Sequence, residues 1–159
     1  MKTLDQIVAL LEMRDLAYRH DQHPLTYTAR ETARAEHIPP RCFAKVVVVH
    51  CEEGFAMAVL PADRIVDLDE LRAAFGTHHL RLATEHELEK LFPSCELGAM
   101  PPLGNGTIFE MPVWVDGLLL AEEQICFNAG THKDVVWMST EDWEHLIKPS
   151  VLAFAHAAG

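Results

Sequence analysis

The chain has 159 residues, enough for one domain that buries a substantial core without disulfides or a structural metal. Hydrophobic residues make up 49% of it, which excludes an intrinsically disordered protein, and no apolar run approaches the roughly 20 residues of a membrane helix. The formal net charge of −11 argues against broad, non-specific binding of nucleic acid through the phosphate backbone.

The first third of the chain predicts two helices and an extended segment. A capping-box pattern, Thr3-x-x-Gln6, precedes apolar residues at helical spacing and predicts a helix near residues 3–14. Residues 18–23 favour a short strand. A second pattern, Thr28-x-x-Glu31, predicts a helix that Pro39-Pro40 ends, since proline cannot continue it.

The middle of the chain predicts a hairpin followed by two helices. Residues 43–50 and 55–60 are apolar strands on either side of Glu52-Glu53-Gly54, a sequence typical of a tight turn. Asp67 is placed to begin a third helix that Gly76 ends. Thr84 begins a fourth, short helix that Pro93 closes. The glycine and proline residues of 96–106 exclude regular structure there.

The last third predicts a second hairpin, two more strands and a final helix. Asp116-Gly117 between two apolar runs is a strong hairpin signal. Strands are expected at 124–128 and 134–138, and Ser139 or Thr140 is placed to cap a helix around Trp143. Strands and helices in this mixture predict a single α+β domain over residues 1–159. Its expected core is a central mixed, mostly antiparallel sheet flanked by helices.

The four cysteines form no C-x-x-C pair and fall in or beside apolar stretches: Cys42, Cys51, Cys95 and Cys126. This is the pattern of reduced, buried cysteines in a cytoplasmic protein, and no zinc site is expected. The N-terminus has no long uncharged core of a signal peptide, because Asp5 and Glu12 interrupt it. We therefore expect a cytoplasmic protein that is not bound to a membrane.

Three segments carry residues with potential chemistry. Lys45 begins the apolar run 46–49, where a cation needs either solvent or an anion, and a lysine that reaches solvent at a strand edge is the simpler alternative. The loop Gly98–Gly104 combines glycine and proline and is either a plain surface turn or a stiff loop that exposes backbone amides. Asn128–His132 lies between two predicted strands, where an ordinary turn is equally expected.

These segments, in this order, resemble the YbaK/prolyl-tRNA-synthetase-associated domain family. The resemblance is carried by Ala44-Lys45 with four valines, Val59–Asp63, Gly98-x-x-x-Pro102-x-Gly104 and Asn128–His132, and it covers about residues 20–150. Members of that family hydrolyse mischarged aminoacyl-tRNA. The resemblance therefore implies a YbaK-like fold and a free-standing deacylase for mischarged tRNA, with alanine or cysteine on the proline tRNA as the usual substrate.

The resemblance also implies the roles of individual residues. The lysine that matches Lys45 holds the terminal-nucleotide phosphate or positions the ester. The loop lines the aminoacyl pocket, and its matching residues are Gly98, Ala99, Met100, Pro102 and Gly104. Gly130 closes the pocket opposite the lysine, His132 contacts the substrate amino group or a water, and Thr28 supports the pocket wall. Helix capping explains Thr28 equally well.

The implied partners are the aminoacylated 3′ end of tRNA and an aminoacyl-tRNA synthetase that delivers it, with no metal and no cofactor. No Ser-His-Asp spacing or nucleotide-binding loop is present in the sequence, so no covalent intermediate is indicated. Two other functions remain open at this stage. One is a non-catalytic module that binds an aminoacyl or nucleotide ligand and associates with a synthetase, which the net charge favours. The other is a hydrolase for small unrelated esters.

Overall fold

A computed structural model describes residues 2–23, 28, 33 and 37–157. Its largest sheet has five strands in the order β5-β2-β3-β6-β9. The hairpin of β2 (Ala44–Cys51) and β3 (Gly54–Pro61) forms its centre, with Lys45 opposite Leu60. β5 (Leu80–Leu82) adds to β2 in antiparallel orientation, whereas β6 (Val113–Asp116) runs parallel to β3 and β9 (Ser150–Leu152) parallel to β6. The central sheet is therefore mixed, as predicted.

The described residues also form two smaller sheets, and both are antiparallel throughout. β8 (Asp134–Ser139) pairs with β1 (Tyr18–Gln22) on one side and with β7 (Gln124–Asn128) on the other. β4 (Arg64–Val66) pairs with β10 (Ala155–Ala157). An isolated parallel bridge between Phe43 and Cys126 joins the start of β2 to β7 and so links the three-stranded sheet to the central one.

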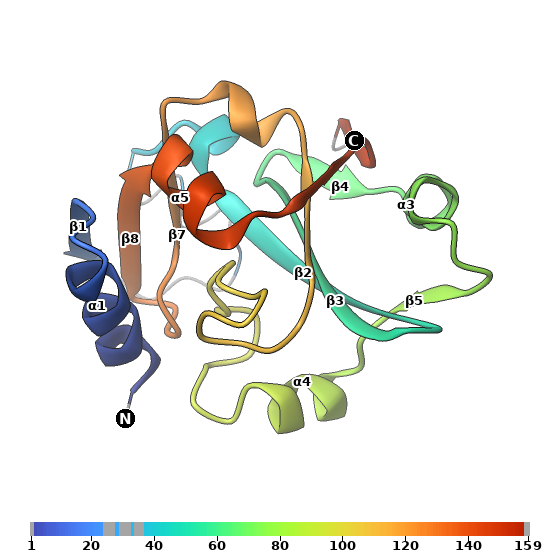
Figure 1. The fold of residues 1–159 in the computed structure, drawn as a ribbon, viewed down its shortest axis with the longest axis horizontal. Helices are drawn as coiled ribbons and strands as arrows, with labels where there is room; N and C mark the ends of the chain where they lie inside the picture. The colour runs from blue at the N-terminus through green and yellow to red at the C-terminus, as the bar shows by residue number, and fades with distance from the viewer. Residues whose placement is uncertain (1, 24–27, 29–32, 34–36, 158–159) are drawn as a thin grey trace.

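Four α-helices lie within the described residues, and Figure 1 shows them around the sheets. α1 (Thr3–Met13) lies with β1 beside β8. In this view α5 (Thr140–Ile147) is at the top, α4 (Glu85–Leu91) at the bottom, and α3 (Leu68–Phe75) at the right, next to β4. None of these helices is long and apolar enough to cross a membrane. The predicted α+β class is confirmed.

Local sequence signals explain where three helices begin. The side chain of Asp67 accepts a hydrogen bond from the Glu70 amide, and that of Ser139 accepts one from the Asp142 amide. Thr84 and Glu87 form a complete capping box at the start of α4. Each cap satisfies a backbone N–H that the first turn of a helix leaves without a partner, so these predictions from sequence are confirmed.

Two local predictions are wrong. Thr3 is not a cap: it is the first helical residue, it is buried, and its Oγ1 lies 3.0 Å from Ser94 Oγ. Asp116-Gly117 is not a hairpin turn, because the chain continues from β6 into a 3-10 helix at Leu119–Ala121. Asp116 instead accepts hydrogen bonds from the backbone amides of Phe154 and Ala155, about forty residues away in sequence. Tertiary partners outweigh the local pattern at both positions.

The predicted helix after Thr28 falls almost entirely outside the described residues. Within the described part, the strands predicted near 18–23, 43–50, 55–60, 124–128 and 134–138 are confirmed. The irregular segment at 96–106 is confirmed as well. That residues 1–159 form one domain stays a prediction.

The two faces of the central sheet belong to different hydrophobic clusters. Val48 and Val59 point into the larger cluster, which α1, α5 and the segment 99–113 also fill. Val49 and Trp114 point into a smaller cluster with α3. Side chains alternate between faces along a strand, so the odd-numbered positions of β2, Lys45 among them, face away from the larger cluster.

Candidate functional site

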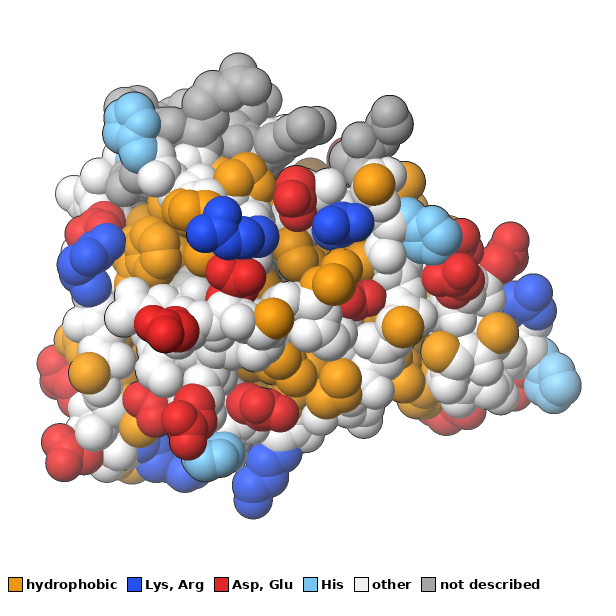
Figure 2. Space-filling view, turned by 90° about the horizontal axis from the view of Figure 1, so that it is seen from above, with side chains coloured by type: hydrophobic (Ala, Val, Ile, Leu, Met, Phe, Trp, Pro, Cys, Tyr) orange, Lys and Arg blue, Asp and Glu red, His pale blue; other side chains and the backbone are white. Residues whose placement is uncertain are grey.

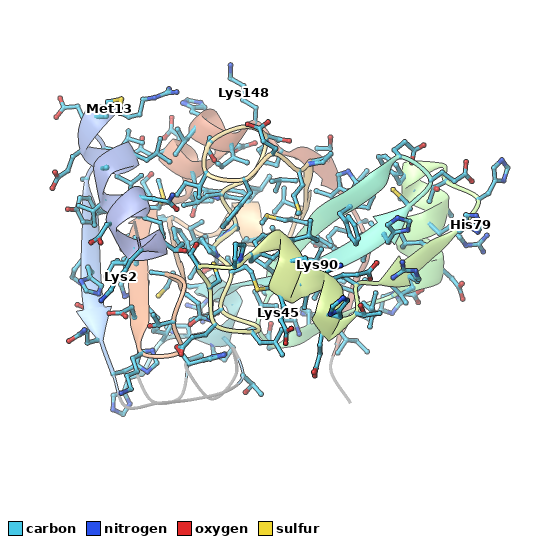
Figure 3. All side chains as sticks on the ribbon, turned by 90° about the horizontal axis from the view of Figure 1, so that it is seen from below. Lys2, Met13, Lys45, His79, Lys90 and Lys148 are labelled. Atoms are coloured by element: carbon cyan, nitrogen blue, oxygen red, sulfur yellow. The ribbon has the colours of Figure 1, made fainter. Side chains whose placement is uncertain are left out.

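Lys45 lies at the start of β2, where the central sheet meets the three-stranded sheet. Its side chain is half-buried. In Figure 3 it lies toward the side of the molecule opposite Lys148, which extends outward at the top of the view. The Phe43–Cys126 bridge lies two residues before Lys45 and two residues before Asn128, and β2 and β7 leave it in the same direction. Lys45 and Asn128 therefore follow on the same face of the joined sheets.

The loop Gly98–Gly104 turns inward instead of lying on the surface. Gly98 is exposed, but Ala99, Met100 and Leu103 are almost fully buried, and the last two belong to the larger hydrophobic cluster. The backbone carbonyl of Pro102 accepts a hydrogen bond of 2.9 Å from Trp143 Nε1 on α5. In Figure 1 the segment, coloured yellow, fills the space between the β7–β8 pair and the β2–β3 hairpin. The ordinary surface turn is thereby excluded.

Gly104 ends the loop at a point where no side chain fits. A Cβ built there would lie 2.5 Å from the carbonyl oxygen of Met111 and 2.7 Å from Cγ2 of Val113. Real Cβ atoms essentially never come so close to another residue, so packing alone demands glycine. The glycine that the resemblance assigned to substrate binding thus has a structural reason of its own.

Three backbone amides of the loop have no hydrogen-bond acceptor among the described residues: those of Gly98, Met100 and Gly104. The N–H of Ala99 donates to the carbonyl of Glu96. The amide of Gly98 lies at the exposed end of the loop, where a ligand can reach it, whereas Met100 and Gly104 are buried. A backbone N–H without a partner is the kind of donor that stabilises a developing oxyanion.

The turn between β7 and β8 contains Gly130 and His132. Gly130 has a positive φ of 91°, and a Cβ there would lie 2.7 Å from Cβ of Thr3 in α1, so both conformation and packing select glycine. The imidazole of His132 is buried, with 7% of the residue exposed. Its Nε2 lies 2.5 Å from the carbonyl of Leu97, and since a carbonyl only accepts, Nε2 carries the proton.

The loop and the turn are hydrogen-bonded to each other. The Gly130 amide donates to the carbonyl of Ala99 over 2.9 Å, and the Glu96 amide donates to the carbonyl of Gly130 over 2.8 Å. The Glu96 carboxylate accepts from the His132 amide over 2.8 Å. A Cβ on Gly98 would lie 3.6 Å from the His132 ring. The loop and the turn, about thirty residues apart in sequence, are therefore joined into one rigid unit with Gly98 at its exposed end.

Asp134 fixes the other side of the turn. Its carboxylate accepts hydrogen bonds from the Thr131 hydroxyl at 2.6 Å, from His20 Nε2 at 2.7 Å and from Gln22 at 3.1 Å. Burial alone would raise the pKa of this carboxyl group. The three hydrogen bonds stabilise the charged form more strongly, so the pKa is lowered overall. The β7–β8 turn is thus held by a permanently charged carboxylate at neutral pH.

Comparison with known families decides which kind of protein has this arrangement. The model of the aminoacyl-tRNA editing domain matches residues 23–146, a range that contains Lys45, the Gly98–Gly104 loop and the Gly130–His132 turn. The chain belongs to this family. The resemblance inferred from the sequence motifs is thereby confirmed at the level of the editing domain.

Two curated proteins that match this chain are each 30% identical to it over the matched part. The multifunctional Ser/Thr-tRNA deacylase ProXp-y of Escherichia coli K12 is 30% identical over 103 residues, which are 64% of this chain and 60% of that protein. The proline–tRNA ligase of Thermosipho africanus is 30% identical over 81 residues, 51% of this chain and 14% of the ligase. The matched part thus covers less than two thirds of the length of these curated relatives.

Solved structures support the fold of the editing domain. A putative trans-editing enzyme for prolyl-tRNA synthetase superposes with a TM-score of 0.81 at 23% identity, with 100% of this chain and 99% of that chain covered. The hypothetical protein APE2540 gives a TM-score of 0.83 at 19% identity and covers 95% and 99% of the two chains. At such identities these likenesses establish the architecture alone.

Sequence reasoning missed two residues that contact or adjoin the candidate site. Glu96 holds the His132 amide, yet nothing in its sequence context distinguishes it from a solvated glutamate. Asn128 is 6% exposed, and its Oδ1 has no hydrogen-bond donor among the described residues. A buried acceptor without a donor calls for an explanation, and Asn128 shares the face of Lys45. Only the strand pairing reveals that neighbourhood.

Thr28 is exposed and lies in a bend, and the residues around it are outside the described ranges, so its expected role at the pocket wall stays a prediction.

A cavity of about 470 Å³ lies behind the β7–β8 turn, between the first turn of α1 and residues 93–96. Its lining includes Lys2, Thr3 and Cys95. This cavity borders Gly130 from the α1 side, the side on which Thr3 packs.

One group of side chains in the described part has the composition of a metal site. Ligand atoms of Asp67, Glu70 and His156 lie within 4.8 Å of one another. His156 Nε2 is already 2.8 Å from a Glu70 oxygen, and this hydrogen bond raises the pKa of the imidazole. These contacts connect the start of α3 to β10 at the surface.

The surface charge of the protein is poorly suited to a nucleic-acid partner. Figure 2 shows acidic side chains spread over one face of the molecule, with scattered Lys and Arg among the residues drawn there in colour. Several arginines are neutralised locally. Arg41 contacts Glu122 at 3.1 Å, and Arg81 contacts Glu87 at 2.7 Å, a pair that lowers the pKa of Glu87 to about 2. Such pairs reduce the positive potential available to phosphates.

Proposed function

We propose that the protein is a trans-editing deacylase that hydrolyses the ester bond of mischarged aminoacyl-tRNA. The family match over residues 23–146 carries this proposal, because it spans all three segments of the site. In the reaction, the oxygen of a water molecule attacks the carbonyl carbon of the ester. The bond from that carbon to the ribose oxygen breaks, the ribose oxygen takes up a proton, and free amino acid and tRNA leave.

The proposed substrate is the proline tRNA that carries a small, wrong amino acid, with alanine or cysteine first. The Escherichia coli relative is named for serine and threonine, so these two belong in the panel as well. The physical need for such an enzyme is general. A synthetase pocket discriminates a missing methylene by only about 1–3 kcal/mol, so slightly smaller amino acids are attached and a second site must remove them.

In this proposal the protein positions the reactants and forms no covalent intermediate. The Lys45 ammonium holds the terminal phosphate or the ester. The amide of Gly98, at the exposed end of the loop, stabilises the oxyanion that develops on the carbonyl oxygen. Ala99, Pro102, Gly104 and Gly130 shape the surrounding wall. His132 supports Gly98, beside which its ring lies, because its Nε2 proton is already donated to the carbonyl of Leu97.

The net charge of −11 limits how the substrate is held. Each phosphate contact adds to affinity and to its dependence on salt, and an acidic protein makes few of them. We therefore propose that the chain grips the aminoacylated 3′ end alone and that a synthetase delivers the tRNA. A role on charged tRNA places the protein in the cytoplasm. Hydrolysis should then fall only slightly when the salt concentration is raised.

The direct test is deacylation of a panel of mischarged tRNAs by wild type, Lys45→Ala and Lys90→Ala. Lys90 is exposed on α4, so its substitution makes the same charge change outside the proposed site. Loss of a charge-assisted hydrogen bond worth about 1.5–3 kcal/mol corresponds to a roughly 10- to 150-fold decrease in kcat/KM for Lys45→Ala. The Lys90 variant should match wild type. Undiminished hydrolysis by Lys45→Ala would remove Lys45 from the mechanism.

A second function deserves the same assay because the acidic charge favours it. The site would then bind an aminoacyl or nucleotide ligand without turnover and recruit a synthetase. Single-turnover experiments with protein in excess separate the two: a binding module retains the intact ester on the protein, whereas an editing enzyme releases free amino acid. Hydrolysis of free aminoacyl esters as fast as that of aminoacyl-tRNA would instead indicate a general small-ester hydrolase.

A further inference from the structure

Glu96 connects the two segments of the site through three separate hydrogen bonds. Its amide donates to the carbonyl of Gly130 over 2.8 Å, and its own carbonyl accepts from the amide of Ala99 over 3.0 Å. Its carboxylate Oε1 accepts from the amide of His132 over 2.8 Å. One residue therefore contacts both ends of the turn and the first buried residue of the loop. We infer that Glu96 is a positioning residue of the editing site, an inference that rests on the proposed function.

The side-chain bond is the part of this connection that residue type decides. Any residue except proline at position 96 supplies the two main-chain bonds, but only a side chain of the right length brings an acceptor to the His132 amide. Glu96 is otherwise exposed, so neither burial nor apolar packing gives a reason for a long acidic side chain there.

The consequence of this bond reaches Gly98 through His132. The His132 backbone is held by Glu96, and its ring is held by the Leu97 carbonyl. The ring in turn lies beside Gly98, whose amide has no acceptor among the described residues. If the side-chain bond is lost, the turn and the free amide lose their common support. A displacement of about 1 Å in such a site costs on the order of 100-fold in rate.

Four variants separate reach from charge. Glu96→Gln loses the charge but keeps an acceptor at the same distance, whereas Glu96→Asp keeps the charge but is one methylene too short. Glu96→Ala removes both, and Glu89→Ala makes the same charge change at an exposed position of α4. We expect the rate constant of single-turnover deacylation to fall about 10- to 100-fold in the Asp and Ala variants. The Gln variant should stay within about threefold of wild type, and KM should change little in all of them.

A second measurement does not depend on catalysis. Hydrogen exchange at the His132 amide, followed by NMR, should accelerate in the Ala and Asp variants and stay slow in the Gln and Glu89→Ala variants. Unchanged exchange in Glu96→Ala would overturn the inference, as would full activity of that variant. An active Asp variant with an inactive Gln variant would also overturn it, because charge and not reach would then matter.

The two proposals fail in distinguishable ways. If wild type hydrolyses none of the mischarged tRNAs, the proposed function is wrong, and the exchange rates still decide whether Glu96 holds the turn. If wild type is active but Glu96→Ala is as active and as protected at His132, only the role of Glu96 is wrong. Melting temperatures of the four variants should agree within a few degrees, because an exposed side chain contributes little to global stability.

Discussion

Substitution of Gly104 tests the tight packing of the Gly98–Gly104 loop. In Gly104→Ala the new Cβ lies 2.5 Å from the Met111 carbonyl oxygen, whereas ordinary contact begins at 3.4 Å, so the backbone must open by about 0.9 Å. The obstacle is main chain and cannot rotate away. The same carbonyl accepts a 2.8 Å hydrogen bond from the Asn105 amide, which the displacement would weaken.

The magnitude follows from these two effects. Overpacking a buried site costs about 1–3 kcal/mol, and a weakened hydrogen bond adds about 1 kcal/mol. At about 2–4 °C per kcal/mol for a domain of this size, the melting temperature should fall by roughly 5–15 °C. Differential scanning calorimetry or thermal denaturation by circular dichroism measures this directly.

Gly117→Ala is the matched control for this substitution. Its added methyl group would meet only Cγ1 of Val151, at 3.7 Å, an ordinary contact distance. We expect its melting temperature to be unchanged or slightly raised, because alanine reduces the entropy of the unfolded chain. Equal melting temperatures for the Gly104 and Gly117 variants would refute the packing described for the loop.

Two further predictions concern Asn128 and Asp134. Asn128→Leu replaces a buried, unpaired acceptor by an apolar group of similar size. The free energy of unfolding should therefore stay equal or rise by about 1 kcal/mol, while deacylation falls. A clearly less stable but fully active variant would show that the amide serves the fold alone. Asp134 has a lowered pKa, so its contribution to stability is present above its unfolded pKa near 3.8 and is lost as pH falls through the folded value. Urea denaturation between pH 7 and pH 3 should therefore give a shallower loss of stability for Asp134→Asn than for wild type, and identical slopes would contradict the hydrogen-bonded carboxylate.

Most of the secondary structure follows from local chemistry that the sequence shows. Asp67, Thr84 and Ser139 cap helices as expected, since a side-chain oxygen beside a free N–H needs no distant partner. The β2–β3 hairpin follows from two apolar runs around a short polar turn. The errors occur where a distant partner competes for the same group. Thr3 contacts Ser94, and Asp116 binds backbone amides near the C-terminus.

The order of motifs in the sequence was sufficient to identify the editing-domain family, and it named three segments whose joint role in a site stays a prediction. Their spatial relation depended on the tertiary structure. The hydrogen bonds from Gly130 to Ala99 and from His132 to Glu96, and the neighbourhood of Lys45 and Asn128, join residues that lie 30 to 80 positions apart. Hydrophobic periodicity and capping rules act over a few residues, so they determine elements. Which elements meet is decided by the burial of their apolar faces against one another, and that is a property of the folded chain as a whole.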